Sequence, residues 1–249
     1  MTNTIFETIT RKKQYKYPYL LLGLYVTFLF STVCVSSMVV KVGPLLLPGG
    51  IFSFPLTFCI CDIVGEVYGY AYPRLFIWIG VLGEFILSFF VITVSHLPTP
   101  PFYSDAPAYQ TVFDPTIRYV ISALVGLLVG ELANVYLLSK WKIILKGKFF
   151  IFRSLVSTAF GQALLTIVVD ILNFSGTQAN HKLGHLMIGG YLWKMGSALL
   201  MVFPAWLLVK YLKRVEQVDH YDVNTNFNPF IFTLGDENRN SRSTQSSLA

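Results

Sequence analysis

Six stretches of about twenty mainly apolar residues dominate the sequence and restrict the folds open to it. They cover residues 18–40, 53–70, 74–97, 116–139, 154–174 and 189–212. A helix of about this length spans the hydrocarbon core of a bilayer. Only 13% of the chain is charged, against about 25% in an ordinary soluble domain. The sequence therefore predicts an all-α, polytopic membrane protein, a bundle of six transmembrane helices.

Lysine and arginine are distributed unequally between the two ends of these helices. Only Lys41 and Lys182 lie in loops at one end, whereas thirteen basic residues precede, follow or connect the helices at the other end. The thirteen are Arg11, Lys12, Lys13, Lys16, Arg74, Lys140, Lys142, Lys146, Lys148, Arg153, Lys210, Lys213 and Arg214. Basic loops stay in the cytoplasm, so both termini are predicted to be cytoplasmic. This placement also favours a membrane, and not nucleic acid, as the partner of a chain with net charge +6.

The chain divides into three parts by composition. Residues 1–17 form a basic N-terminal segment, 18–212 the transmembrane domain, and 213–249 an Asn- and Ser-rich tail that is expected to be disordered. Residues 41–50 are expected to be a short turn, and Pro55 is expected to leave the segment before it unwound or kinked. Five prolines between residues 98 and 115 predict a stiff loop that caps the outer mouth of the bundle.

The second stretch, SFPLTFCICDIVGEVYGY, carries two carboxylates inside an apolar segment. Asp62 and Glu66 are four residues apart and project from one face of a helix. An acidic residue that faces lipid is costly, so such residues turn towards a bundle interior or an aqueous cavity. We take Asp62 as the centre of a binding site, with Glu66 beside it or at the headgroups.

Further polar residues recur in the other predicted helices. Glu84, Glu131 and Asp170 add three acids, and Lys194 is expected to pair with one of the acids. Asn134, and the four-residue stripe Thr158, Gln162, Thr166 and Asp170, add hydrogen-bonding groups. Polar side chains on several helices indicate a polar cavity enclosed by the bundle.

The sequence contains no recognised enzyme motif and no metal-binding spacing. His181 and His185 are too few for a metal site, and Cys34, Cys59 and Cys61 lie in apolar runs without a suitable disulfide geometry. No cofactor is expected. An intramembrane enzyme that uses paired carboxylates remains an alternative, although no nucleophile accompanies the acids. An assembly protein whose acids only form structural ion pairs is a further alternative.

Four motifs resemble the queuosine precursor transporters, also called the vitamin uptake transporter family. They are the F-P-x-x-F-x-x-x-D pattern that starts at Phe54, then GELANVYLLSKWK, FIFRSLVSTAFGQ, and YLWKM followed by Pro204. The similarity extends over most of residues 18–212. It implies an inner-membrane (plasma-membrane) carrier that imports 7-cyano-7-deazaguanine or 7-aminomethyl-7-deazaguanine for tRNA queuosine salvage. Leu165 stands where many members have an acid.

The resemblance and the chemistry of the solute together select the candidate site residues. Carboxylates accept the adjacent N–H and amine donors of a deazaguanine, amides pair with its remaining edge, and aromatic rings stack on it. The expected site comprises Phe54, Phe58, Asp62, Glu66, Tyr68, Glu131, Asn134, Gln162 and Lys194. Coupling protons and a homo-oligomer stay open, as does a substrate-binding membrane subunit for another purine-like or vitamin-like solute.

Overall fold

The computed structural model describes residues 15–114, 116–174, 180–223 and 225–231, and six of its helical segments are long and apolar enough to cross a membrane. The predicted six-helix, mostly helical architecture is thereby confirmed. The helices are α2 (Pro18–Val35), α3 (Phe54–Tyr68), α4 (Ala71–Ser95), α5 (Ala106–Phe113), α6 (Thr116–Gly126), α7 (Leu132–Ile144), α8 (Phe150–Phe174) and α9 (Asn180–Glu216). A π-helical segment, η2 (Leu127–Glu131), joins α6 to α7, and a 3₁₀ turn, η1 (Gly49–Phe52), precedes α3.

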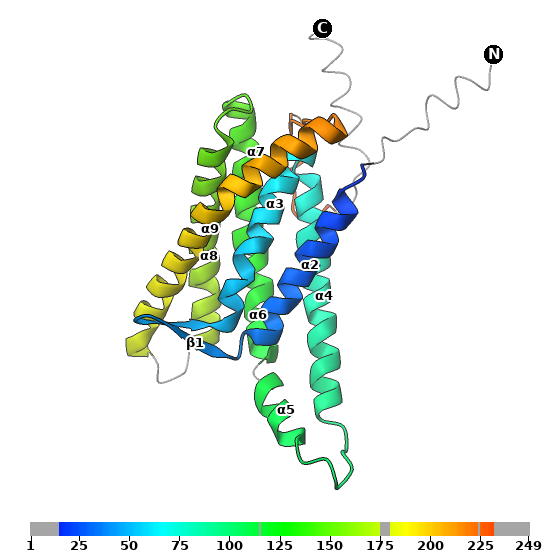
Figure 1. Cartoon of the computed structure of the whole chain (residues 1–249), viewed down its shortest axis with the longest axis vertical. Coiled ribbons are helices and arrows are strands. Elements are labelled where there is room, and N and C mark those ends of the chain that lie inside the picture. Colours follow the sequence, from blue (N-terminus) through cyan, green and yellow to red (C-terminus); the bar gives the residue numbers. More distant parts are fainter. Residues whose placement is uncertain (1–14, 115, 175–179, 224, 232–249) are drawn as a thin grey trace, which may run out of the picture.

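Helix α3 is the centre of the bundle. Thirteen of its fifteen residues are buried, and it contacts α2, α4, α7, α8 and α9. Figure 1 shows α2 and α4 on one side of α3 and α8 and α9 on the other. Pro55 lies in the first turn of α3, where its missing N–H would have had no helical partner. The proline therefore starts this helix instead of kinking it, and the segment before it is a 3₁₀ turn.

The helices and the loops differ from the predicted boundaries in three places. The segment expected as a turn is an antiparallel hairpin, β1 (Val39–Val42) with β2 (Leu45–Pro48), in which Val39 pairs with Pro48. Gly43 at its tip has φ +58°, a conformation that glycine adopts without strain. The proline-rich loop contains the short helix α5, and α9 begins before and ends after the predicted sixth stretch.

Helices α6 and α8 pack closely because glycines face each other. A Cβ atom added at Gly130 would lie 2.6 Å from the carbonyl oxygen of Gly161, and one added at Gly161 would lie 2.6 Å from that of Gly130. Gly126, one turn before Gly130, packs against Val169 in the same way. This close approach of backbones is the packing that small residues permit between membrane helices.

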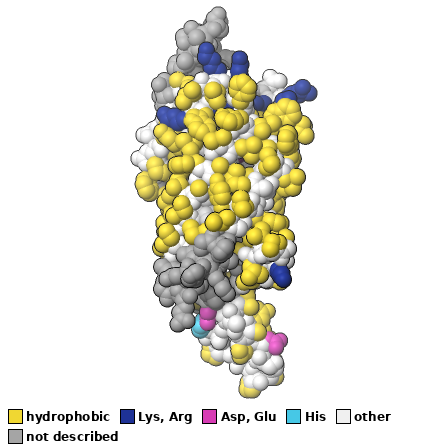
Figure 2. All heavy atoms as spheres, turned by 90° about the vertical axis from the view of Figure 1, so that its left-hand side faces the viewer, with side chains coloured by type: hydrophobic (Ala, Val, Ile, Leu, Met, Phe, Trp, Pro, Cys, Tyr) yellow, Lys and Arg dark blue, Asp and Glu magenta, His cyan; other side chains and the backbone are white. Residues whose placement is uncertain are grey.

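The outer surface has the polarity expected of a membrane protein. Figure 2 shows a broad apolar belt, with Lys and Arg gathered at one end of the face in view. The N-terminal end of α2, the C-terminal end of α9 and the turn between α7 and α8 lie at this same end (Figure 1). The placement agrees with the charge asymmetry of the sequence, and cytoplasmic termini remain a prediction.

The C-terminal segment beyond α9 is ordered over part of the range that was expected to be disordered. Residues 213–216 belong to α9, and residues 217–223 and 225–231 pack on the same end of the bundle; residues 232–249 lie outside the described range. The Asp222 carboxylate accepts the Tyr70 N–H at 3.1 Å, and Trp78 donates to the Pro229 carbonyl at 2.7 Å. Specific polar partners and aromatic contacts, such as Phe227 against Tyr70, hold this segment in spite of its composition.

Two titratable groups of this docked segment lie outside the membrane-spanning helices. Burial disfavours the charged form of His220, so its pKa lies below the ordinary value of 6.5. Burial raises the pKa of Asp219, but the ammonium groups of Lys142 and Lys213, at 2.7 and 2.9 Å, outweigh it and hold this pKa below its usual value. The Asp219 shift stabilises the docked segment at neutral pH, where the carboxylate is ionised, whereas the His220 shift weakens docking only as the pH falls below 6.5.

Candidate functional site

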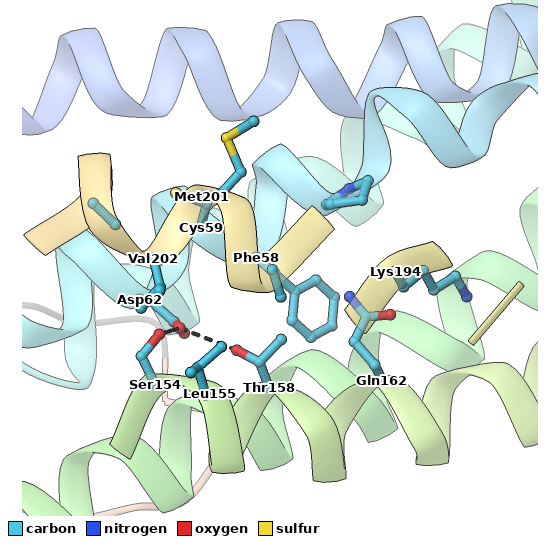
Figure 3. Close-up of a pocket in the computed structure, with 13 residues that line it drawn as sticks. Phe58, Cys59, Asp62, Ser154, Leu155, Thr158, Gln162, Lys194, Met201 and Val202 are labelled. Carbon is cyan, nitrogen blue, oxygen red and sulfur yellow. Dashed lines mark hydrogen bonds between the residues drawn. The ribbon is translucent and has the colours of Figure 1, made fainter. Parts of the chain in front are cut away.

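A polar pocket lies where α3, α8 and α9 meet. Helix α3 contributes Asp62 to it, and the other two helices supply the opposite wall. Figure 3 shows the Asp62 carboxylate directed at the hydroxyls of Ser154 and Thr158 on α8. Because Ser154, Thr158 and Gln162 follow each other at four-residue spacing, all three project from the face of α8 that meets α3.

The Asp62 carboxylate is 2% exposed and accepts three side-chain hydrogen bonds. Asn134 Nδ2 donates to Oδ1 at 2.7 Å, Thr158 donates to Oδ2 at 3.1 Å, and Ser154 also donates to Oδ2. A carboxylate has about four lone-pair positions. One position on Oδ1 is therefore open to a further donor, and the two hydroxyls on Oδ2 can rotate away to admit another.

Gln162 is the second buried polar group of the pocket. Its side chain lies between Phe58 and Lys194 (Figure 3). The side chain is 1% exposed, and its Oε1 has no hydrogen-bond partner among the described residues. A buried acceptor without a partner costs roughly 1–3 kcal/mol. Because the Gln162 oxygen lines a pocket, this cost is recovered when a solute donates a hydrogen bond to that oxygen.

Lys194 departs from the sequence-based expectation. Its Nζ donates to Thr166 Oγ1 at 3.0 Å and lies 5.6 Å from the centre of the Phe54 ring. Across the described residues, no carboxylate comes within the 4.0 Å of an ion pair with it. The expected contact ion pair with an intramembrane acid is not formed, because Lys194 donates to a hydroxyl instead; Asp170 on α8 is the acid that interacts with it electrostatically over a longer distance.

Apolar side chains complete the pocket. Phe58 on α3, Leu155 on α8, and Met201, Val202 and Ala205 on α9 line it. The free space at its centre is about 20 Å³, enough for about one water molecule. A two-ring solute would not fit in this arrangement, so α9 has to move away from α3 and α8 before such a solute can enter.

Glu66, one turn beyond Asp62, lies outside this pocket and is held by three cations. Arg153 Nη1 donates to its Oε2 at 2.9 Å, Lys213 Nζ to its Oε1 at 2.7 Å, and Lys142 Nζ lies 3.8 Å from Oε1. With Asp219 bridging the two lysines, this cluster joins α3, α7, α8, α9 and the docked segment. The structure thus gives Glu66 a role in closing the basic end of the bundle, in place of the substrate contact expected from the sequence.

The nine residues selected from the sequence separate into three groups. Phe58, Asp62, Gln162 and Lys194 line the pocket, and Phe54 and Asn134 contact that lining. Glu66, Tyr68 and Glu131 lie elsewhere: Tyr68 donates to Glu216 at 3.4 Å near the basic end, and Glu131 accepts from Tyr25 on the far side of α3. Sequence reasoning missed Ser154 as a partner of Asp62, although it extends the polar stripe of α8 by one turn.

The three cysteines are free thiols. No group of three or more His, Cys, Asp or Glu residues that could hold a metal ion occurs in the described ranges. The structure places His181 and His185 in the first turns of α9 but does not describe their side chains.

The fold and the pocket define a class of protein: a multi-pass membrane protein with a polar pocket inside its bundle. Residues 48–209 match the family described as "Putative vitamin uptake transporter", and the chain belongs to this family. Over 202 residues it is 27% identical to the "Probable queuosine precursor transporter" of Bacillus subtilis (strain 168), a match that spans 79% of this chain and 87% of that relative. The family resemblance of the sequence motifs is thus confirmed. No solved structure matches the chain significantly.

Proposed function

We propose that this protein imports a queuosine precursor, a 7-substituted 7-deazaguanine, across the inner (plasma) membrane. The observation that carries the proposal is the buried Asp62 carboxylate, which is held by neutral donors only and lines the pocket beside an unpartnered amide oxygen. The name of the Bacillus subtilis relative supports the same class of solute.

Asp62 is suited to the donor edge of a guanine-like ring. The ring N–H and the exocyclic amine lie side by side, and a carboxylate accepts both through parallel hydrogen bonds. Because Asn134, Ser154 and Thr158 carry no charge, the Asp62 charge is not already neutralised by a protein cation. The carboxylate is therefore free to form its strongest interaction with the solute.

The remaining pocket groups fit the other edges of the same solute. The Gln162 oxygen can accept a further N–H, its amide N–H₂ can donate to the ring carbonyl, and Phe58 offers a ring face for stacking. Apolar residues of α9 close the opposite face. Pro204 in α9 interrupts the helical hydrogen bonding, and a helix bends most easily at such a position. It is a suitable hinge for the movement of α9 that entry requires.

Lys194 distinguishes between the two precursors. It lines the pocket without an ion-pair partner among the described residues, so an ammonium group faces the solute. A 7-cyano group is a neutral acceptor that an ammonium can bind, whereas a 7-aminomethyl group is a cation that it repels. The only other carboxylate near Asp62 on α3, Glu66, is already held by three cations. The pocket therefore favours 7-cyano-7-deazaguanine.

Equilibrium binding to purified protein tests the proposal with a panel of 7-cyano-7-deazaguanine, 7-aminomethyl-7-deazaguanine, guanine and adenine. We expect the cyano compound to bind most tightly and adenine, which lacks the adjacent N–H and amine donors, to bind at least about tenfold more weakly. Lys194→Met is expected to reduce the preference for cyano over aminomethyl by about tenfold or more. Equal binding of adenine, or no purine binding at any pH, would contradict the proposal.

A further inference from the structure

A second group of buried polar residues lies on the side of α3 opposite the pocket. It contains Tyr25 on α2, Glu84 on α4 and Glu131 at the end of the π-helical segment η2, each at most 1% exposed. The Tyr25 hydroxyl donates to Glu131 Oε2 at 2.8 Å. The function proposed above uses none of these residues, although each of them lies in a membrane-spanning segment.

The packing of α2 on α4 brings Glu84 to the same group. A Cβ atom added at Gly80 would lie 2.8 Å from Cε1 and 3.5 Å from the hydroxyl oxygen of Tyr25. Glu84 follows Gly80 by one helical turn and so projects from the same face of α4. The carboxylates of Glu84 and Glu131 also interact electrostatically. Two acids thus face one tyrosine hydroxyl between α2, α4 and η2.

Three buried oxygen atoms of this region have no hydrogen-bond partner among the described residues. They are Glu84 Oε2, Glu131 Oε1 and the hydroxyl oxygen of Ser88. Ser88 is 4% exposed and follows Glu84 by one turn on the same buried face of α4. Unpartnered buried acceptors are rare in folded proteins and call for a bound species or a function. The Ser88 hydroxyl is independent of the two acids and also indicates that the space accepts a ligand.

No basic side chain neutralises the two acids. Within the described ranges, the groups recorded as interacting with them are Tyr25 on α2 and Cys61, with Asp62 beyond it, on α3; no ion pair joins either acid to a basic side chain. Arg118 on α6 donates instead to the carbonyl oxygen of Leu172 at the far end of α8. A carboxylate without a counter-ion in a low-dielectric interior costs several kcal/mol and is neutralised by taking up a proton.

The set of ligands excludes a metal ion as the species that neutralises these acids. A hard cation such as Ca²⁺ takes six to eight oxygen ligands, and Mg²⁺ takes six. Within the described ranges no group of three or more His, Cys, Asp or Glu residues comes together. Two carboxylates and the hydroxyls of Tyr25 and Ser88 are fewer ligands than either divalent cation takes, but they suffice to hold one proton.

We propose that Glu84, Tyr25 and Glu131 form the binding site of the proton that drives uptake, an inference that rests on the transport function proposed above. The proton passes from water outside to a carboxylate oxygen as an O–H bond forms, and it leaves to water inside as that bond breaks. Asn134 links this site to the solute, because it follows Glu131 by three residues and donates to Asp62 at 2.7 Å. A solute bound at Asp62 and a proton bound at Glu131 therefore both act on the helical turn that contains Glu131 and Asn134.

The full chain reconstituted in liposomes tests the inference, with the membrane potential clamped and 7-cyano-7-deazaguanine as the solute. For one proton per solute, each unit of inward pH gradient should support about tenfold accumulation. An inward solute gradient alone should acidify the lumen, as read by a trapped pH-sensitive dye. We expect Glu84→Gln and Glu131→Gln to lose both effects while they retain exchange of labelled for unlabelled solute, a reaction that needs no net proton movement.

Asp170→Asn is the matched control, a partly buried membrane acid on α8 that lies outside this group. It should keep the parent's fold accumulation per unit of pH gradient, because its interaction with Lys194 bears on affinity for the solute and not on coupling. Loss of coupling in Asp170→Asn with normal coupling in both glutamine variants would overturn the assignment. The assignment would also be overturned if the parent protein exchanged solute without acidifying the lumen. That result needs no variant, and it leaves the proposed function standing. A parent that neither binds nor exchanges any deazapurine would overturn both proposals.

Discussion

Asp62→Asn is the substitution that separates solute recognition from folding most clearly. It preserves the size of the side chain and replaces one carboxylate oxygen by an N–H₂ group. In the structure, Oδ1 accepts from Asn134, and Oδ2 accepts from two hydroxyls, those of Ser154 and Thr158. A hydroxyl can rotate to accept a hydrogen bond as well as donate one. With its N–H₂ group at the Oδ2 position, the asparagine therefore keeps its partners in the protein.

The solute's N–H groups cannot switch from donor to acceptor as a hydroxyl can, and this determines how much affinity is lost. Its ring N–H and amine are both donors, so one of them would face the new N–H₂ group. A hydrogen bond to a charged group contributes about 1.5–3 kcal/mol, and the mismatched donors add to its loss. At about 1.4 kcal/mol per decade, binding should weaken by roughly tenfold to a few hundredfold.

The assay is equilibrium binding of 7-cyano-7-deazaguanine in detergent near neutral pH. Expression and insertion should match the parent, because a neutral side chain enters the bilayer more easily than a carboxylate. Glu84→Gln is the comparison, since Glu84 lies across α3 from the pocket and should leave binding within about twofold of the parent. If Asp62→Asn binds like the parent and Glu84→Gln loses binding, the reasoning is refuted, because the site then lies on the other side of α3.

Three further outcomes are expected. Cysteine labelling should reach position 146 from the cytoplasm and position 105 from outside; labelling of position 105 only from the cytoplasm would contradict the topology. Glu66→Gln leaves Arg153, Lys142 and Lys213 without their shared carboxylate. Breaking a buried ion pair costs about 3–5 kcal/mol, so the thermal midpoint of unfolding in detergent should fall clearly. An unchanged midpoint would exclude the cluster as a stabilising element. His220 has a lowered pKa in the docked segment, so docking should weaken as the pH falls below 6.5, its ordinary value. Protection of residues 217–223 against hydrogen exchange, measured relative to the intrinsic exchange rate at each pH, should be lower at pH 5.5 than at about pH 7.5 in the parent and change much less in His220→Gln. Equal protection at both pH values would remove this role of His220.

The membrane architecture could be predicted from the sequence because each part of it is a local property. Helix length, apolar content and the asymmetry of basic residues are all read along the chain, and the bilayer turns them into spans. The importance of Asp62 could be predicted on the same grounds, since a buried carboxylate in an apolar helix requires partners. The close contact of Gly130 with Gly161 could not be predicted in this way, because it depends on which helices are neighbours.

The tail shows where composition misleads. An Asn- and Ser-rich segment has too little apolar surface to fold alone, so the sequence predicts disorder. The bundle supplies what the segment lacks: Arg74 donates to the carbonyl oxygens of Asn226 and Asn228 at 3.3 and 3.2 Å, and the Phe227 ring stacks against Tyr70. These partners come from residues about 150 positions earlier, and no local pattern contains that information.

Only the tertiary structure decided which polar residues share a site. The sequence established that Asp62, Glu66, Glu84, Glu131 and Lys194 lie in membrane helices and need polar surroundings, because an ionised group is costly in hydrocarbon. It could not establish which way each helix is turned. The packing of α3 sends Asp62 towards α8 and α9, Glu66 to three cations at the basic end, and Cys61 towards Glu131 on the opposite side. Adjacent positions on a helix point about 100° apart, so the rotation of α3 alone separates the polar pocket at Asp62 from the buried group around Glu131.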